Sequence, residues 1–473
     1  MAFYDRLSAQ DRSFLEVESP TTHMHVAGAF LFEAAPLTRP EGGIDIERIR
    51  TYIEARLHRI PRYRQRIQWI PFENHPVWVD DERFNIHYHV RHTSLPAPGD
   101  ERQLKRLCGR ILSQQLDRGK PLWEMWIVEG LEHDRMAMLS KVHHCMVDGV
   151  SGIDLLQALL SPLPEKTFDA PPRWMPNPPP GRAVLVRDAA LRRVATPLRA
   201  AAALAGALRA PQLALARLGE NVTGLAQALG SALRPASDTP FNQPIGAHRR
   251  FDWLGFDLDE VKRVKRVLGG TVNDVVLATV AGAVGRFFEQ RGLSYPRQRG
   301  LDFRAFCPVS VRSDSERGAL GNRVSSLIAR LPIAERDPCR RLAAVSRALG
   351  DLKQSKQALG AEVLASVSEW TAPTLIALAM RLGMAGRASN LIVTNVPGPQ
   401  LPLYLLGARM TETYPMVPLF TNQGLGIALF SYSGGLYWGL SADWDLFPDL
   451  HDFVVHLDAS FRELCDAADA AGS

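Results

Sequence analysis

The chain lacks the features that would direct it out of the cell or into a membrane. Its first residues, MAFYDRLSAQDRSFLE, contain no basic stretch followed by an apolar one, so we expect no secretory signal and a cytoplasmic location. No run approaches the roughly 18 apolar residues of a membrane-spanning helix, the closest being AAAALAGAL at 200–208. With 46% hydrophobic and 22% charged residues, the composition predicts a folded, water-soluble protein.

Cysteine pairs and strong charge are also missing. The five cysteines form no CxxC motif, which argues against a zinc ribbon, a thioredoxin-like motif or a disulfide framework, so we interpret them as reduced thiols. The net charge of +5 is weak support for nucleic-acid binding, and we expect no nucleic-acid partner. The segment from Arg182 to Arg234, however, contains eight arginines and only two acidic residues, which gives it a local charge of +6.

The order of the segments predicts two domains of α/β class. Strand-like runs such as VAGAFLFE and MAMLSKVHH alternate with amphipathic stretches over residues 1–165, and the same alternation returns over residues 246–473. Residues 166–245 between them begin as a proline-rich linker and continue as Ala/Leu/Arg helix. We interpret this helix as a crossover between domains, and its basic amphipathic pattern would also suit an anionic lipid surface.

Two helices are predicted near the start of the second domain. The first is expected to be capped by Asp259 and to end at Gly269-Gly270. The second, TVNDVVLATVAGAVGRFFEQRG, is strongly apolar and is therefore expected to be buried.

The stretch KVHHCMVDGVSG at 141–152 carries the residues best suited to chemistry. A metal site is disfavoured, because adjacent residues leaving a strand point to opposite faces and no Cys/His cluster supplies a third ligand. One imidazole at the strand end could instead act as an acid-base group, with Asp148-Gly149 making the turn that follows. A satisfied pair of histidines without a catalytic role remains open on these residues alone.

Resemblance to a known family narrows the choice. The residues HHCMVDG match the HHxxxDG signature of the CoA-dependent acyltransferase superfamily. Other stretches resemble one branch, the bacterial bifunctional wax ester synthase/diacylglycerol acyltransferase family. They occur in the expected order over most of the chain, as ESPTTHMHVAG at 18–28, PLWE at 121–124, Asn273-Asp274 and NVPGP at 395–399.

The resemblance implies a fold of two chloramphenicol-acetyltransferase-like domains with a channel between them. It also implies that His144 is the general base and His143 a supporting residue. Asp148, followed by Gly149, would be structural and held by an arginine of the second domain, for which Arg312 is our candidate. Cys145 is expected to point away from the cleft as the next strand residue, so we assign it to packing rather than to nucleophilic attack.

Each of the remaining motifs has two possible interpretations, one as part of the site and one as ordinary structure. Asn273 and Asp274 could bind substrate or supply an oxyanion donor, or could simply cap a helix. Trp123 could contact substrate, although packing beside a strand is its main physical interpretation. The NVPGP turn could form part of the channel wall or the domain interface, or be a plain turn; its candidate supporting residues are Asn395, Pro397 and Gly398.

The function implied is O-acyl transfer from acyl-CoA to the hydroxyl of diacylglycerol or of a long-chain alcohol, without an acyl-enzyme, metal or cofactor. Acyl-CoA and the acceptor lipid are the expected partners, with peripheral contact to the inner membrane surface or lipid droplets. One alternative is an acyltransferase of this fold that uses a carrier-protein thioester or another hydroxyl acceptor. Another is a lipid-surface binding protein with a vestigial site.

Overall fold

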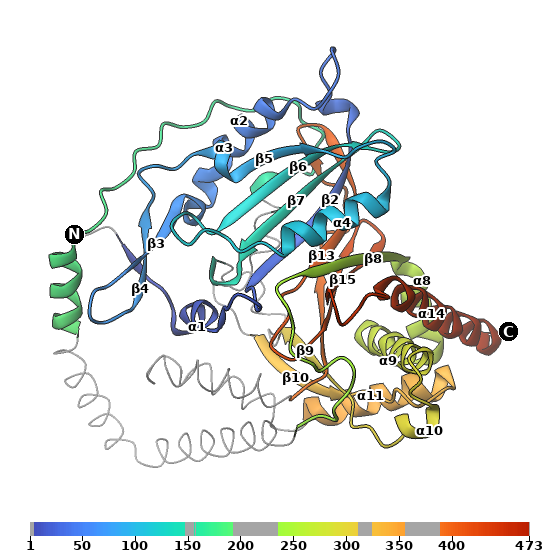
Figure 1. Cartoon of the computed structure of the whole chain (residues 1–473). Helices are drawn as coiled ribbons and strands as arrows, with labels where there is room; N and C mark the ends of the chain where they lie inside the picture. Colours follow the sequence, from blue (N-terminus) through green and yellow to red (C-terminus); the bar gives the residue numbers. More distant parts are fainter. Residues whose placement is uncertain are drawn as a thin grey trace.

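The computed structural model describes residues 4–146, 156, 158–192, 235–310, 324–354 and 388–472. They form two halves, each built on a six-stranded sheet with helices packed against it (Figure 1). The N-terminal half is drawn in blue to cyan, and most of the C-terminal half in yellow to red. This arrangement confirms the prediction of two α/β domains.

The N-terminal half contains a six-stranded sheet of order β12-β13-β2-β7-β6-β5 and a small sheet of order β1-β4-β3. Its own strands are β1 (Asp5–Arg6), β2 (His25–Glu33), β3 (Gln65–Trp69), β4 (Pro76–Asp80), β5 (Val90–Ser94), β6 (Trp123–Leu131) and β7 (Arg135–His143). Its helices are α1 (Ala9–Val17), α2 (Ile46–Arg56), α3 (Ile86–His89) and α4 (Glu101–Leu112), with 3-10 turns at Ala35–Leu37, Leu57–Arg59, Pro61–Arg64 and His144–Met146.

Alternation along β2 explains how this sheet is covered on both faces. Ala29 and Leu31 belong to the apolar cluster that includes α4, whereas Phe30 and Phe32 belong to the cluster that includes α2. Successive strand residues point to opposite faces, so a continuous apolar run is expected where both faces are packed. The sheet is therefore a buried layer between helices.

The C-terminal half contains a sheet of order β10-β9-β11-β14-β15-β8. Its strands are β8 (Arg249–Asp257), β9 (Arg304–Ser310), β10 (Val324–Arg330), β11 (Leu391–Pro397), β14 (Leu425–Tyr432) and β15 (Gly435–Asp443). Its helices are α8 (Leu258–Leu268), α9 (Val272–Gln290), α10 (Tyr295–Gln298), α11 (Pro338–Gln354) and α14 (Leu450–Gly472). Helices α8, α9, α11 and α14 share one apolar core with β11, β14 and β15.

The two helices predicted at the start of this half are present, with one correction. The side chain of Asp257 caps α8, not that of Asp259, because Asp257 accepts the backbone N–H groups of the first turn. The helix ends as predicted at Gly269, whose φ of 86° favours glycine. Helix α9 is buried along most of its length, as its apolar sequence predicts.

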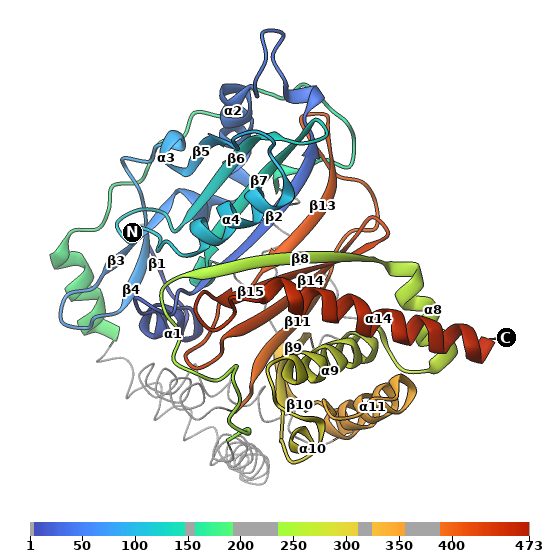
Figure 2. The same cartoon turned by 45° about the vertical axis from the view of Figure 1, so that its right-hand side comes forward.

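Two strands cross from the C-terminal part of the sequence into the N-terminal sheet. β12 (Tyr404–Leu405) pairs with β13 (Ala408–Met416), and β13 pairs antiparallel with β2 (Figure 2). The sequence division at residue 246 assigned this segment to the second domain alone. Periodicity along a chain identifies strands but not their partners, so it gave no sign of this crossover.

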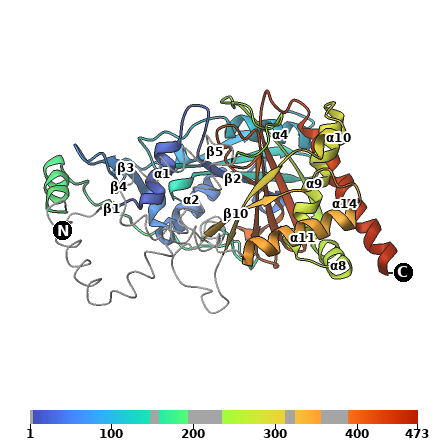
Figure 3. The same cartoon turned by 90° about the horizontal axis from the view of Figure 1, so that it is seen from below.

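The two halves are joined by a shared apolar layer rather than by the crossover alone. Leu104 and Ile111 of α4 lie in one buried cluster with Phe251 and Trp253 of β8 and Tyr414 of β13. Figure 3, seen from below, shows helices α9, α11 and α14 on the side of the C-terminal half away from the N-terminal strands. The face of the C-terminal sheet that carries Phe430 and Tyr432 contacts the N-terminal core.

The proline-rich segment has no regular structure over residues 166–181, as predicted. A helix at 182–192 then packs Leu185 and Ala189 against Val77 and Val79 of β4 in the small sheet. The rest of the predicted basic helix, 193–234, lies outside the described residues. Within the described parts, no single helix has the length and apolar character needed to cross a membrane; α8 and α9 reach that threshold only as a pair bent by 95°.

Candidate active site

The paired histidines lie at the end of β7, in two different backbone conformations. His143 is the last residue of the strand, and His144 begins a 3-10 turn that runs to Met146. The prediction that both histidines leave along a strand is therefore wrong by one residue. His143 is 1% exposed, whereas the side chain of His144 is half-buried.

The ring of His144 is held in a largely apolar environment. It stacks on Phe14 of α1 with ring centroids 4.0 Å apart and an interplanar angle of 26°. Its backbone N–H donates to the carbonyl oxygen of Met24 at 2.7 Å. Burial lowers the pKa of His144 from 6.5 to about 4, with its own backbone carbonyl acting in the opposite direction. The imidazole is therefore neutral near pH 7 and can accept a proton.

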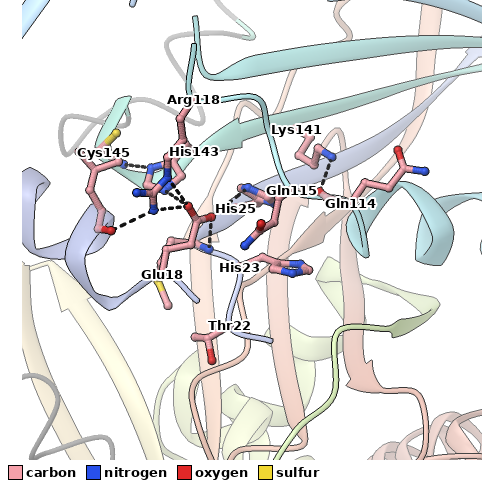
Figure 4. Close-up of polar contacts among 12 residues, drawn as sticks. Glu18, Thr22, His23, His25, Gln114, Gln115, Arg118, Lys141, His143 and Cys145 are labelled. Atoms are coloured by element: carbon pink, nitrogen blue, oxygen red, sulfur yellow. Dashed lines mark hydrogen bonds and ion pairs between the residues drawn. The ribbon is translucent and has the colours of Figure 1, made fainter. Parts of the chain in front are cut away.

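A buried carboxylate lies beside His143 (Figure 4). Glu18 follows the last residue of α1, and its side chain is 4% exposed. Its Oε2 lies 3.6 Å from Nε2 of His143 and accepts hydrogen bonds from Arg118 at 2.6 and 3.0 Å. Burial alone would raise the pKa of Glu18, but contacts with His143, His25 and Arg118 lower it below its ordinary value. Glu18 is therefore ionised.

Two further histidines of the same N-terminal stretch lie near this carboxylate, and one of them contacts it. His25, the first residue of β2, pairs in register with His143, and its Nε2 lies 3.3 Å from Oε1 of Glu18. Burial lowers the pKa of His25 to about 3, opposed by Glu18. Burial also lowers the pKa of His23, whose Nε2 lies 2.9 Å from the carbonyl oxygen of Pro20.

These contacts identify residues that motif reasoning did not select. Glu18, His23 and His25 lie in the ESPTTHMHVAG stretch, which the sequence marked only as a family resemblance. The period-two spacing of His23 and His25 would suggest side chains on one strand face, but β2 begins only at His25. Phe14 and Arg118 gave no comparable signal, because their roles depend on the packing of α1 and of the segment before β6.

Cys145 occupies the middle of the 3-10 turn rather than the next position of a strand, so the geometric reason given for its orientation is wrong. Its side chain is 2% exposed within the N-terminal core, and burial raises its thiol pKa well above the ordinary value. A protonated, enclosed thiol is a poor nucleophile. Its backbone N–H donates to Nδ1 of His143 at 3.1 Å.

Three predicted residues, Asp148, Gly149 and Arg312, lie outside the described residues, so their roles stay predictions. The spacing of the histidines disfavours a metal site. Among the ranges that the structure describes, no group of three or more His, Cys, Asp or Glu side chains is arranged to hold a metal ion.

Two motifs far apart in the sequence meet at the start of α9. Nδ2 of Asn395, on β11, donates to Oδ1 of Asn273 at 2.7 Å. Neither Asn273 nor Asp274 is the cap residue of α9, which is Thr271. Asp274 completes the capping box, its Oδ2 accepting the N–H of Thr271 at 2.7 Å. Asn273 is exposed and Asp274 is 3% exposed, so a substrate or oxyanion role is open to Asn273 and stays a prediction.

The other predicted residues are placed as follows. Pro397 ends β11 opposite Ser431 of β14, and a Cβ on Gly398 would lie 2.4 Å from the carbonyl oxygen of Ser431, so only glycine fits this close approach. Trp123 is 1% exposed; its indole N–H donates to the carbonyl of Tyr63 at 2.7 Å. Substrate contact by Trp123 and a channel-wall role for the turn stay predictions.

Two protein-family models match this chain, one after the other along the sequence. Residues 7–276 match the wax ester synthase/diacylglycerol acyltransferase catalytic domain, and residues 320–465 match the WS/DGAT C-terminal domain. Two proteins of Mycobacterium tuberculosis, both named as diacylglycerol O-acyltransferases, are 35% and 32% identical to this chain. The alignments cover 99% and 94% of this chain, and 91% and 92% of the relatives.

Solved structures support the fold. The wax ester synthase/diacylglycerol acyltransferase from Marinobacter aquaeolei VT8 is 26% identical, with a TM-score of 0.68 over 98% of this chain and all of that chain. The starter condensation domain of rhizomide synthetase has a TM-score of 0.58 at 14% identity, over 98% of this chain and 94% of that one, and so shares the fold alone. The chain belongs to the wax ester synthase/diacylglycerol acyltransferase family and is an acyltransferase.

Proposed function

We propose that this enzyme moves a long-chain acyl group from acyl-CoA to the hydroxyl of diacylglycerol, and to long-chain alcohols when these are the acceptors. The mycobacterial relatives are named as diacylglycerol O-acyltransferases, and the Marinobacter enzyme is named for both reactions. The single observation that carries the proposal is the position of the His144 imidazole, which lies in the turn after β7 and stacks on Phe14, within the HHxxxDG signature of CoA-dependent acyltransferases.

The proposed reaction has two proton transfers and no covalent enzyme intermediate. His144 takes the proton of the acceptor hydroxyl as its oxygen attacks the thioester carbonyl. When the C–S bond breaks, the imidazolium returns this proton to the CoA thiolate, so ester and CoA leave and the base is regenerated. Neither a metal nor a cofactor is required in this scheme, because acyl-CoA already carries an activated acyl group.

The developing oxyanion needs a preorganised donor. We assign this role to Asn273 or to a backbone N–H near the start of α9, where amide groups are free and the helix dipole is positive. The bond from Asn395 occupies the carbonyl oxygen of Asn273. This leaves the amide nitrogen of Asn273 able to donate elsewhere.

An acceptor panel tests the proposal. The purified enzyme is given one long-chain acyl-CoA with diacylglycerol, hexadecanol, monoacylglycerol or no acceptor, and the products are resolved by chromatography. We expect CoA release to depend on the acceptor and to match triacylglycerol or wax ester formation. Activity with an acyl-pantetheinyl carrier protein but none with acyl-CoA would instead support the condensation-like alternative.

We also propose that the enzyme meets its lipid substrates at an anionic lipid surface. Phe72, on the turn between β3 and β4, is 93% exposed, and a hollow beside it is lined by Trp69, Arg182 and Val186. An apolar tip beside a basic side chain suits the headgroup region of a bilayer. Sedimentation with phosphatidylglycerol vesicles should fall for Phe72→Ser, whereas turnover on detergent-dispersed substrate should be retained.

A further inference from the structure

Two backbone hydrogen bonds fix the turn that carries the base, and both lead to one carboxylate. The N–H of His144 donates to the carbonyl of Met24, and the N–H of Met24 lies 3.4 Å from Oε1 of Glu18. The N–H of Cys145 donates to Nδ1 of His143, and Nε2 of His143 lies 3.6 Å from Oε2 of Glu18. Oε1 of Glu18 therefore supports the hydrogen bond of the His144 N–H, and Oε2 supports that of the Cys145 N–H.

Glu18 also holds the apolar side of the base, through its backbone N–H and through the arginine bound to its carboxylate. Phe14, which stacks on the ring of His144, accepts the backbone N–H of Glu18 at its carbonyl oxygen at 3.2 Å. Arg118 bonds Oε2 of Glu18 and also donates to the carbonyl of Leu15 at 2.9 Å. The end of α1 is thereby fixed against the segment before β6, and the position of the Phe14 ring depends on it.

We propose that Glu18 is a positioning residue for the general base. It does not touch the reacting atoms. Its carboxylate fixes the backbone on both sides of His144 and, through α1, the ring that His144 stacks on. This role goes beyond the proposed function but rests on it, because it assumes that His144 is the base.

The chemistry of a carboxylate is what this position requires. Two oxygens must accept from Arg118 and face His143, His25 and the N–H of Met24, and an ionised carboxylate has acceptor capacity for all of these. In Glu18→Gln, one oxygen becomes an NH2 group that cannot accept, and the charge opposite Arg118 is lost. Glu18→Asp keeps the charge but withdraws the oxygens by one methylene.

Hydrogen exchange of the full-length protein tests the positioning directly. In Glu18→Gln we expect the amides of His144 and Cys145, read in a peptide spanning 142–146, to exchange about tenfold faster, because their acceptors are no longer fixed. A peptide from the middle of β7, 136–141, should be unchanged. Glu16→Gln is the matched control: Glu16 lies on α1 and pairs with Arg12 at 2.6 Å, and this variant should leave both peptides unchanged.

A double-mutant cycle tests whether Glu18 acts through the base. Glu18→Gln should lower kcat, normalised to folded protein, by about 100-fold, since misplacing a catalytic group by 1 Å can cost that much. In a His144→Ala background the same change should lower the residual rate by less than about twofold, because no base remains to be positioned. KM for acyl-CoA should change little in the single variant.

The outcomes separate the two proposals. Unchanged exchange at 142–146, or an equal loss with and without His144, overturns the role of Glu18 even if His144→Ala is inactive. Full activity of His144→Ala would instead overturn the proposed base. Should Glu18→Gln fail to fold, Glu18→Asp is measured in the same way, and unchanged exchange there rejects the proposal.

Discussion

The two halves of the molecule share one pattern of strand pairing, but they place different residues at the equivalent strand ends. In the N-terminal sheet β5 runs parallel to β6, β6 and β7 form a hairpin, and β7 pairs with β2. In the C-terminal sheet β11, β14, β15 and β8 repeat this pattern in the same order. His25 opposite His143 in the first half thus corresponds to Arg249 opposite Asp443 in the second.

The difference between these pairs is one of charge. Arg249 and Asp443 lie 3.8 Å apart, and Asp443 also accepts backbone N–H groups from Gly246, Asp445 and Leu446. Oppositely charged partners satisfy each other and close the strand end. The histidine pair draws its negative charge from Glu18, outside the sheet. The N-terminal strand end is therefore stabilised by a carboxylate from outside the sheet. It leads into the turn that carries His144, the candidate base.

The C-terminal pair also contacts the N-terminal half across the interface between the halves. Arg249 donates to the carbonyl of Thr21, within the stretch that joins Glu18 to His25, and its backbone N–H donates to Ser113 at the end of α4. The strand end of the C-terminal half thereby holds the loop that carries the carboxylate of the N-terminal half. Of the two equivalent strand ends, one therefore carries the candidate site and the other supports the loop beside it.

The largest expected effect is on the reaction at the N-terminal strand end. His144→Ala should lower kcat by about 10³-fold, since general base catalysis contributes roughly 10²- to 10⁴-fold. The melting temperature should change little, because the half-buried ring is not part of the charged network. The rate of CoA release with diacylglycerol as acceptor measures this, with the exposed His58→Ala as control. A loss below about fivefold would contradict the assignment.

Breaking the C-terminal pair should cost stability instead. Asp443→Ala leaves the guanidinium of Arg249, which is 5% exposed, without its carboxylate, and removing one partner of a buried pair costs about 3 to 5 kcal/mol. Urea unfolding should show this loss, while kcat per folded molecule stays within about threefold. A loss of kcat per folded molecule well above threefold would mean that the C-terminal strand end also acts on the reaction, and not on stability alone.

Much of the fold follows from the sequence, and the reason is local. The run VAGAFLFE predicted β2, and the strongly apolar segment after Gly270 predicted the buried helix α9. Gly269 ended α8 as expected, since its positive φ is a property of one residue. The cap of α8 was misplaced by two residues, because Asp257 and Asp259 are equally good cap residues and only the backbone decides between them.

The site was less predictable, because its parts are far apart in the sequence. The signature named His144, but nothing near residue 144 pointed to Glu18 or Phe14, which reach it through the packing of α1. Likewise the contact between Asn273 and Asn395 joins motifs 122 residues apart. Long-range pairing of this kind, including β13 with β2, depends on the assembled sheet rather than on any local pattern.

Acid should weaken the N-terminal strand end before the C-terminal one. The pKa of His25 is about 3 in the fold against 6.5 in a model peptide, mainly because of burial, with Glu18, Lys141 and His143 as its charged or titratable neighbours. Between these values the unfolded chain binds the proton and the folded one does not, so stability falls as pH drops below about 6.5.

Unfolding free energies at pH 7.5 and 5.5 measure this effect. His25 should contribute a loss of up to about 1.4 kcal/mol per pH unit over the titrating part of that interval. His25→Gln should remove that part of the slope. Arg249→Gln, at the corresponding position, should destabilise the protein and leave the contribution of His25 to the slope in place. Equal slopes in wild type and His25→Gln would show that the histidine pair carries no such linkage.

The smallest expected effect on stability is at the bond between Asn395 and Asn273, which is exposed. Asn395→Ala should cost less than about 1 kcal/mol, since a typical hydrogen bond contributes about that much net. If the bond orients Asn273 toward the oxyanion, kcat should nevertheless fall several-fold with KM unchanged. Asn390→Ala is the control: Asn390 just precedes β11, is 0% exposed and bonds Asn242 at 2.7 Å, so its loss should lower stability and spare kcat per folded molecule. Equal behaviour of the two variants would assign Asn395 to structure alone.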